Sequence, residues 1–153
     1  MNMENLSIKF QTVNLPVVHT CDGEDISPGF EVSGIDPNRA VTMAVVMNDP
    51  DAAGGFTHWV IWNLNPLEQV PAAIPQEPVV RTPVEAVQGK NSYGLIGYSG
   101  PCPPPGQTHR YDFKVYGLDT RLELDPGATK PELLKAIEGH VVQYGEGFVV
   151  YGR

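Results

Sequence analysis

The stretch that decides the fold is VTMAVVMNDPDA, residues 41–52. Nearly every position from Val41 to Met47 is apolar, which predicts a buried central β-strand. The run stops abruptly at Asn48-Asp49-Pro50, a sequence that is typical of a turn. Further strands are expected over residues 58–64, 111–118, 7–11, 79–81 and 148–151.

One stretch, beginning at Thr129, has the pattern of an amphipathic helix. Thr129 can cap the helix, and Glu132, three residues later, completes a capping box. The apolar stripe consists of Leu133, Ile137 and Val141. Gly145 is expected to stop the helix. We therefore predict a single helix that packs its apolar face on the sheet.

The composition indicates one mostly β domain over residues 1–153. A chain of 153 residues can bury a full hydrophobic core without the support of a metal or a disulfide. Its 16 Gly and 15 Pro are well above average usage and occur without a simple repeat. This pattern favours short strands that are joined by tight turns.

The charge of the chain argues against several kinds of partner. With 18 acidic and 10 basic residues the net charge is -8, which repels nucleic acid and anionic membranes. Residues 1–10 lack the pattern of a signal peptide, and no run of 18 apolar residues occurs. We expect a cytoplasmic protein with no nucleic-acid partner and no stable membrane association. Cys21 and Cys102 could form a disulfide, but reduced thiols are the favoured interpretation in that compartment.

Strand periodicity gathers a set of candidate site residues, because side chains two positions apart share a face. The columns are residues 41, 43, 45, 47 and 49; residues 109, 111, 113 and 115; and residues 58, 60, 62 and 64. His109 and Tyr111 are expected to point inward. If the strands at 41–48 and 58–64 pair as a hairpin, Asp49 and His58 lie at the same end.

A carboxylate beside one or two imidazoles can hold a phosphate-like anion when the histidines are protonated. An ionised Asp49 would raise the pKa of a neighbouring histidine and orient its ring. The prediction is a small, pH-sensitive anion pocket. A purely structural interpretation stays open: inward histidines often satisfy core hydrogen bonds, and Asp49 before Pro50 is a common turn former.

Four motifs carry a family resemblance. They are Asn48-Asp49-Pro50-Asp51-Ala52, His58-Trp59, Gly100-Pro101-Cys102-Pro103-Pro104-Pro105-Gly106 and His109-Arg110-Tyr111. In this order they resemble the signature of the phosphatidylethanolamine-binding protein (PEBP) family, in its prokaryotic branch of Raf kinase inhibitor-like proteins. Shorter matches extend the resemblance over nearly the whole chain.

The resemblance implies a PEBP-like fold with a large central antiparallel sheet, a smaller second sheet and one C-terminal helix. The residues that it implies for ligand binding are Asp49, His58, His109, Tyr111, Trp59, Pro104 and Pro105. Family members often carry a cis peptide near this site, which makes the X-Pro bonds of residues 101–105 candidates.

The function that the resemblance implies is binding of a small anion, a phosphate or a phosphoryl head group. Such a protein is expected to regulate or inhibit a kinase or a protease, to need no cofactor or metal, and to have no catalytic residues. Homodimer formation is a further implication. The family name suggests a phospholipid, but a free head group or phosphorylated metabolite fits the charge of the chain better.

Two other functions remain open. The first is a hydrolase that uses Asp49 with His58 or His109, although a nucleophile is missing: Pro101 replaces the glycine that a serine elbow at Ser99 requires. The second is a metal site built from the same three side chains, although the sequence has no closely spaced pair of ligands.

Overall fold

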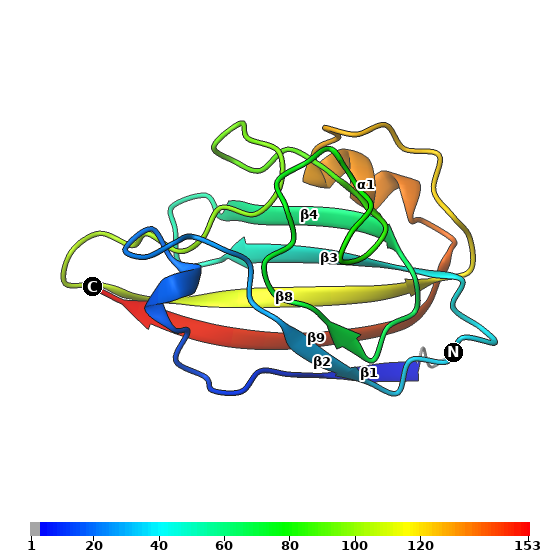
Figure 1. The fold of residues 1–153 in the computed structure, drawn as a ribbon, viewed down its shortest axis with the longest axis horizontal. Coiled ribbons are helices and arrows are strands. Elements are labelled where there is room, and N and C mark those ends of the chain that lie inside the picture. Colours follow the sequence, from blue (N-terminus) through cyan, green and yellow to red (C-terminus); the bar gives the residue numbers. More distant parts are fainter. Residues whose placement is uncertain (1–3) are drawn as a thin grey trace.

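Nine strands join into one mixed sheet in the computed structural model, which describes residues 4–153 (Figure 1). The strands are Glu4–Lys9 (β1), Phe30–Ser33 (β2), Thr42–Asp49 (β3), Phe56–Leu64 (β4), Gln69–Val70 (β5), Val79–Val80 (β6), Ala86–Gln88 (β7), Thr108–Leu118 (β8) and Val141–Gly152 (β9). Their order is β5-β2-β1-β9-β8-β3-β4-β7-β6. β1 runs parallel to β9, and the other neighbours are antiparallel.

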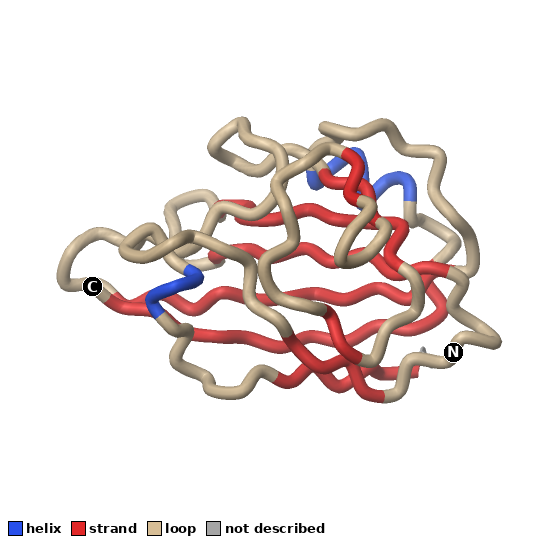
Figure 2. The backbone as a smooth tube through the Cα atoms, viewed as in Figure 1, coloured by secondary structure: helices blue, strands red, loops and turns tan. Residues whose placement is uncertain are grey.

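The prediction of a mostly β fold with a helix near the C-terminal end is confirmed. The α-helix of the described chain, α1, spans Lys130–Ala136, and a 3-10 turn, η1, spans Val17–His19. In place of a separate smaller sheet, the short strands β5, β6 and β7 extend the edges of the large one. Long loops cross one face of this sheet (Figure 2).

Strand β3 is buried along nearly its whole length because both faces of the sheet are covered there. On one face Met43, Val45 and Met47 pack in a large cluster with Phe113 and Trp59. The second cluster, on the opposite face, contains Ala44, Val46, Val60, Trp62, Leu118, Leu133 and Ile137. Since Leu133 belongs to α1, the helix packs on the sheet as its apolar stripe predicts.

The predicted capping box is present, but the helix is shorter than we predicted. Glu132 accepts a hydrogen bond from the backbone N–H of Thr129 at 2.9 Å. The helix ends at Ala136, and Gly139 then adopts a φ of 79°, which turns the chain into β9. Gly145 does not stop the helix. It lies inside β9, where a Cβ atom would come within 2.2 Å of the carbonyl oxygen of Leu6 in β1.

The proline-rich loop, residues 100–106, differs from our expectations in two respects. Cys102 is not a free thiol but forms a disulfide with Cys21, which lies in the turn that follows η1. The fold brings the two Cα atoms to 5.4 Å, within bonding range, although 81 residues separate them in sequence. The X-Pro bonds of this loop are trans, and the cis peptide of the described chain precedes Pro83.

Candidate functional site

Five of the seven predicted site residues line one pocket at an end of the central strands, and four of them carry polar groups. Asp49 ends β3, His58 lies near the start of β4, and His109 and Tyr111 belong to β8. The pocket has a volume of about 190 Å³ and is also lined by Ala52, Phe56, Tyr93, Cys102, Pro103 and Pro104. One carboxyl group and two imidazoles from distant parts of the sequence therefore share a small cavity.

A β-bulge brings His58 to this pocket, and our strand columns missed it. Met47 of β3 pairs with Trp59, whereas the next residue, Asn48, pairs with Thr57, so His58 is an extra residue in β4. The ring of His58 packs edge-on against Tyr111, with 5.3 Å between ring centroids. Val60 and Trp62, which the sequence placed in the same column as His58, pack in the cluster on the opposite face.

The carboxylate of Asp49 contacts both the turn that follows it and the ring of His109. One carboxylate oxygen accepts hydrogen bonds from the backbone N–H groups of Asp51 (2.8 Å) and Ala52 (3.1 Å), as a turn former does. The other oxygen lies 2.7 Å from Nδ1 of His109. Both side chains are almost fully buried. Nε2 of His109 is 2.8 Å from Oε1 of Gln107, an exposed residue of the adjoining loop.

His58 has a different electrostatic environment from the one that we predicted. Its Nδ1 donates a hydrogen bond to the carbonyl oxygen of Ser99 at 2.6 Å, which fixes the tautomer and leaves Nε2 free. Burial lowers the pKa of His58, and this effect exceeds the opposing effects of the Ser99 carbonyl and the Asp49 charge. The Asp49 charge does raise the pKa of His58, as we predicted, but the net shift is downward because burial outweighs it.

Tyr111 offers an unused hydrogen-bond donor. Its hydroxyl group is buried and has no hydrogen-bond partner within residues 4–153. Burial, together with the charge of Asp49, raises the pKa of Tyr111 well above its usual value, so the hydroxyl stays protonated. A buried polar group without a partner carries a free-energy cost of about 1–3 kcal/mol. A ligand atom that accepts a hydrogen bond from this hydroxyl would remove that cost.

The predicted wall of the pocket is only partly correct. Pro104 lines the pocket, together with its neighbour Pro103, but Pro105 does not. Trp59 is fully buried in the core, where its indole N–H donates to Oε1 of Gln88 at 2.8 Å.

Sequence reasoning missed two aromatic wall residues, Phe56 and Tyr93, which pack edge to face with 4.7 Å between ring centroids. Phe56 pairs directly with Asp49 across the hairpin, and this pairing is the signal that could have identified it.

Comparisons with known proteins identify the family of the chain. The sequence model of the phosphatidylethanolamine-binding protein family matches residues 8–151. The chain belongs to this family. A UPF0098 protein of Pyrococcus abyssi is 48% identical over 141 residues, which cover 91% of this chain and 79% of the relative. A UPF0098 protein of Methanothermobacter thermautotrophicus is 45% identical over 145 residues, which cover 91% of each protein.

Solved structures of PEBP homologues share the fold over nearly the whole chain. The homologue CT736 from Chlamydia trachomatis superposes with a TM-score of 0.85 at 30% identity, covering 98% of this chain and 99% of its own. YbcL of Escherichia coli, described as a member of the mammalian PEBP family, gives 0.84 at 27% identity, covering 97% and 98%. The predicted family is thereby confirmed.

The structure of this PEBP-family protein also identifies a positioning residue that we did not predict. Asn91 is buried and makes four hydrogen bonds within one loop. Its amide nitrogen donates to the carbonyl of Gly97 and the hydroxyl of Ser99, and its oxygen accepts from the N–H groups of Tyr93 and Leu95. Asn91 thus holds both the aromatic wall and the segment whose carbonyl orients His58.

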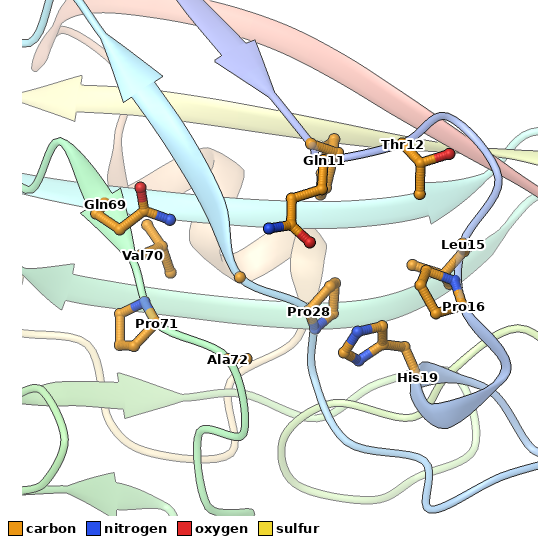
Figure 3. Close-up of a pocket in the computed structure, with 12 residues that line it drawn as sticks. Gln11, Thr12, Leu15, Pro16, His19, Pro28, Gln69, Val70, Pro71 and Ala72 are labelled. Atoms are coloured by element: carbon orange, nitrogen blue, oxygen red, sulfur yellow. The ribbon is translucent and has the colours of Figure 1, made fainter.

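A larger pocket, of about 320 Å³, lies at the edge of the sheet beside β5 (Figure 3). Its lining includes three prolines, the side chains of Gln11 and Gln69, and His19, whose Nδ1 is 2.9 Å from the carbonyl oxygen of Ile26. Its lining contains no acidic or basic side chain other than His19. It therefore lacks the paired carboxyl and imidazole groups that distinguish the smaller pocket.

Neither a metal cluster nor a membrane-spanning helix is found in the described chain. No three His, Cys, Asp or Glu side chains of residues 4–153 are grouped so that they could hold a metal ion, and the metal-site hypothesis gains no support. Within the same range, no helix is long and apolar enough to cross a membrane. The cytoplasmic location stays a prediction.

The buried state of His58 predicts how stability depends on pH. Because the folded state lowers the pKa of His58, the unfolded chain binds more protons below the ordinary value of 6.5. His58 therefore makes folding less favourable as pH falls through and below 6.5. Urea unfolding at pH 7.5, 6.5 and 5.5 should show that His58→Asn loses less stability on acidification than the parent protein does. Parallel curves for the two proteins would contradict this assignment, and His140→Asn, at an exposed site, serves as the control.

Proposed function

We propose that this PEBP-family protein binds a small phosphorylated or otherwise anionic ligand in the pocket of Asp49, His58, His109 and Tyr111. The observation that carries the proposal is the convergence of these side chains around an unpartnered, buried tyrosine hydroxyl. The small volume of about 190 Å³ favours a head group or a free phosphorylated metabolite over a whole lipid.

The chemistry of the pocket supports this class of ligand. The neutral hydroxyl of Tyr111 can donate to a phosphate oxygen, and the Asp49 carboxylate contacts Nδ1 of His109 and orients its ring. Nε2 of neutral His58 is an acceptor, so it suits a ligand that brings its own proton, such as a monoprotonated phosphate or an ammonium group. The aromatic and proline wall shields these polar contacts from water.

Regulation of a protein target, a kinase or a protease, is the second part of the proposal. Two large apolar side chains, Tyr93 and Leu95, are 51% and 55% exposed, and Tyr93 also lines the pocket. Exposed aromatic and aliphatic groups of this kind favour protein contacts. A partner that covers them would lie across the entrance of the ligand pocket. A homodimer is the other partner that the resemblance implies.

The hydrolase alternative is less favoured because Ser99 does not face a histidine with its hydroxyl group. The hydroxyl accepts a hydrogen bond from Asn91, whereas it is the carbonyl oxygen of Ser99 that faces His58. A serine nucleophile requires the opposite arrangement, with its hydroxyl on the imidazole of the general base. The pocket has the groups for binding but lacks an activated nucleophile among its lining side chains.

Calorimetric titration of inorganic phosphate and of phosphoethanolamine, at pH 6.5, tests the proposal. We expect His109→Ala to weaken binding by about tenfold or more, because hydrogen bonds to charged groups contribute roughly 1.5–3 kcal/mol. His140→Ala is the matched control: His140 also contacts an aspartate, Asp119, at 2.8 Å, but lies outside the pocket on an exposed surface.

Two results would refute the proposal. The first is that neither phosphate compound binds, and the second is that His140→Ala and His109→Ala weaken binding equally.

A further inference from the structure

One wall of the ligand pocket is a proline-rich segment that lacks most of its backbone N–H donors. Residues 101–105 read Pro-Cys-Pro-Pro-Pro, and Cys102, Pro103 and Pro104 line the pocket. Four of the five residues have no backbone N–H, so the segment cannot join a β-ladder. Its placement must come from contacts with other parts of the chain.

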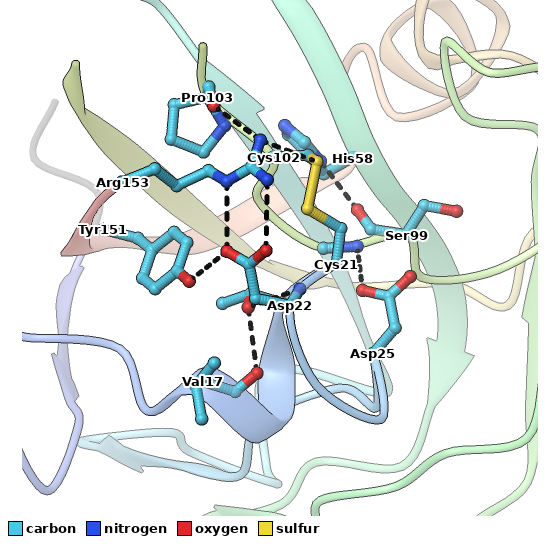
Figure 4. The surroundings of a disulfide bond; sticks show 12 residues. Val17, Cys21, Asp22, Asp25, His58, Ser99, Cys102, Pro103, Tyr151 and Arg153 are labelled. Carbon is cyan, nitrogen blue, oxygen red and sulfur yellow. Dashed lines mark hydrogen bonds and ion pairs between the residues drawn. A yellow bond between two sulfur atoms is a disulfide. The ribbon is translucent and has the colours of Figure 1, made fainter. Parts of the chain in front are cut away.

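Several contacts of this segment lead to one turn, which contains Cys21 and Asp22 (Figure 4). The carbonyl of Pro101 accepts a hydrogen bond from the N–H of Cys21 at 3.1 Å, and Cys102 is bonded covalently to Cys21. The carbonyl of Pro103 accepts from the guanidinium of Arg153 at 3.2 Å. That guanidinium is held in turn by two contacts with the carboxylate of Asp22, at 3.1 and 3.2 Å.

The turn itself is firmly attached to the frame of the molecule. Thr20 is fully buried, and its hydroxyl donates to the carbonyl of Val17 at 2.9 Å and accepts from the N–H of Asp22 at 3.2 Å. The hydroxyl of Tyr151, near the end of β9, donates to Asp22. The disulfide thus adds a covalent link between this anchor and the wall, which is otherwise held by hydrogen bonds to the carbonyls of Pro101, Pro103 and Pro104.

Both ends of the bond are accessible, since Cys21 and Cys102 are exposed residues. A reductant can therefore reach the disulfide without unfolding of the chain. The wall segment also begins two residues after Ser99, whose carbonyl orients His58 (Figure 4). A change in the wall would consequently reach the polar groups of the pocket.

We propose that the Cys21–Cys102 disulfide is a redox switch that sets the affinity of the pocket for its anion. The inference rests on the proposed function and adds its regulation. A dithiol reductant breaks the S–S bond in two exchange steps: one of its thiolates attacks a sulfur to form a mixed disulfide, and its second thiol displaces the protein. Two electrons and two protons pass to the protein, which gains two S–H groups, while the dithiol becomes a disulfide.

The oxidised form has the higher affinity because its wall is already ordered before the ligand arrives. In the reduced form the wall keeps its hydrogen bonds to Cys21 and Arg153 but loses the covalent link. Binding must then order part of the wall again. If the backbone of one residue has to be reordered, the affinity falls about tenfold, since fixing one residue costs roughly 1–2 kcal/mol.

The experiment titrates phosphoethanolamine and inorganic phosphate into the oxidised protein and into the same protein reduced with dithiothreitol. We expect binding about tenfold weaker after reduction. NMR signals of the His58 and Tyr93 rings, recorded without ligand, should also shift on reduction. The double variant Cys21→Ser/Cys102→Ser is the matched control. Its affinity should equal that of the reduced protein and should not change when dithiothreitol is added.

Two outcomes would refute the switch, and a third would refute ligand binding itself. Equal affinity in both redox states, with unchanged ring signals, would show that the bond has no effect on the pocket. Unfolding of the whole chain on reduction, followed by circular dichroism, would make the bond a global support and not a switch. Absence of phosphate binding by the oxidised protein would instead overturn the proposed function, which the ring signals do not test.

Discussion

Replacing Asp49 with alanine is expected to lower the free energy of unfolding by about 3–5 kcal/mol and to abolish phosphate binding. The change removes three hydrogen bonds at once: two from backbone N–H groups of the following turn and one from the ring of His109. Both partners of the Asp49–His109 pair are buried, so Nδ1 of the imidazole would lose its hydrogen-bond partner in a site that water does not reach. Urea unfolding and phosphate calorimetry measure the two effects.

Asp49→Asn separates the structural role of Asp49 from its electrostatic role. The amide oxygen can still accept from the N–H groups of Asp51 and Ala52, so the turn should persist and the loss of stability should be smaller, about 1–3 kcal/mol. Anion binding should nevertheless be lost, because the amide nitrogen that then faces Nδ1 of His109 cannot accept a hydrogen bond, so the ring loses the partner that orients it. If Asp49→Asn instead binds phosphate more tightly, the negative charge of Asp49 opposes the ligand and the proposed role of the pair is wrong.

Much of the sheet could be predicted because its central strand is apolar along nearly its whole length. The run from Val41 to Met47 predicts a strand that is covered on both faces, and the structure has that strand at Thr42–Asp49. The column of His109 and Tyr111 is likewise correct, since β8 is regular through these residues. Three of the four pocket side chains therefore follow from local pattern alone.

The position of His58 depends on a β-bulge, which the periodic pattern of the sequence does not predict. In a regular strand its side chain would lie on the face of Val60 and Trp62, away from Asp49. The bulge between Thr57 and Trp59 reverses this. We placed His58 in the pocket because we expected a hairpin end, and that expectation did not include the bulge.

The disulfide and the end of α1 could not be predicted, because both depend on contacts between distant parts of the sequence. The disulfide joins residues that are 81 positions apart, and it depends on how η1 and the proline-rich loop meet in space. The end of α1 depends on β9, in which Val141 pairs with Leu118 of β8 and so belongs to the sheet. In both cases tertiary contacts, which the local pattern does not encode, decide the outcome.

Trp59 was predicted from the sequence to line the pocket, but in the structure it lies in the core. Its replacement is therefore expected to have a large effect on stability. Trp59→Ala is expected to cost about 3–5 kcal/mol of folding free energy, the usual range for removing a fully buried tryptophan. The indole packs against Tyr98, with 5.6 Å between ring centroids, and its N–H donates to Gln88. Thermal and urea unfolding would measure this loss.

Trp59→Phe tests whether Trp59 belongs to the core or to the pocket wall, because the two roles predict different effects on stability and on phosphate affinity. Phenylalanine retains most of the apolar contact but leaves Oε1 of Gln88 without its donor, so stability should fall by about 1–3 kcal/mol. Phosphate affinity, measured below the unfolding transition, should stay within about twofold, because Trp59 does not line the pocket and its ring lies in the core. A large loss of affinity with unchanged stability would mean that Trp59 contacts the ligand, in a pocket that extends past His58 along the same face of the sheet.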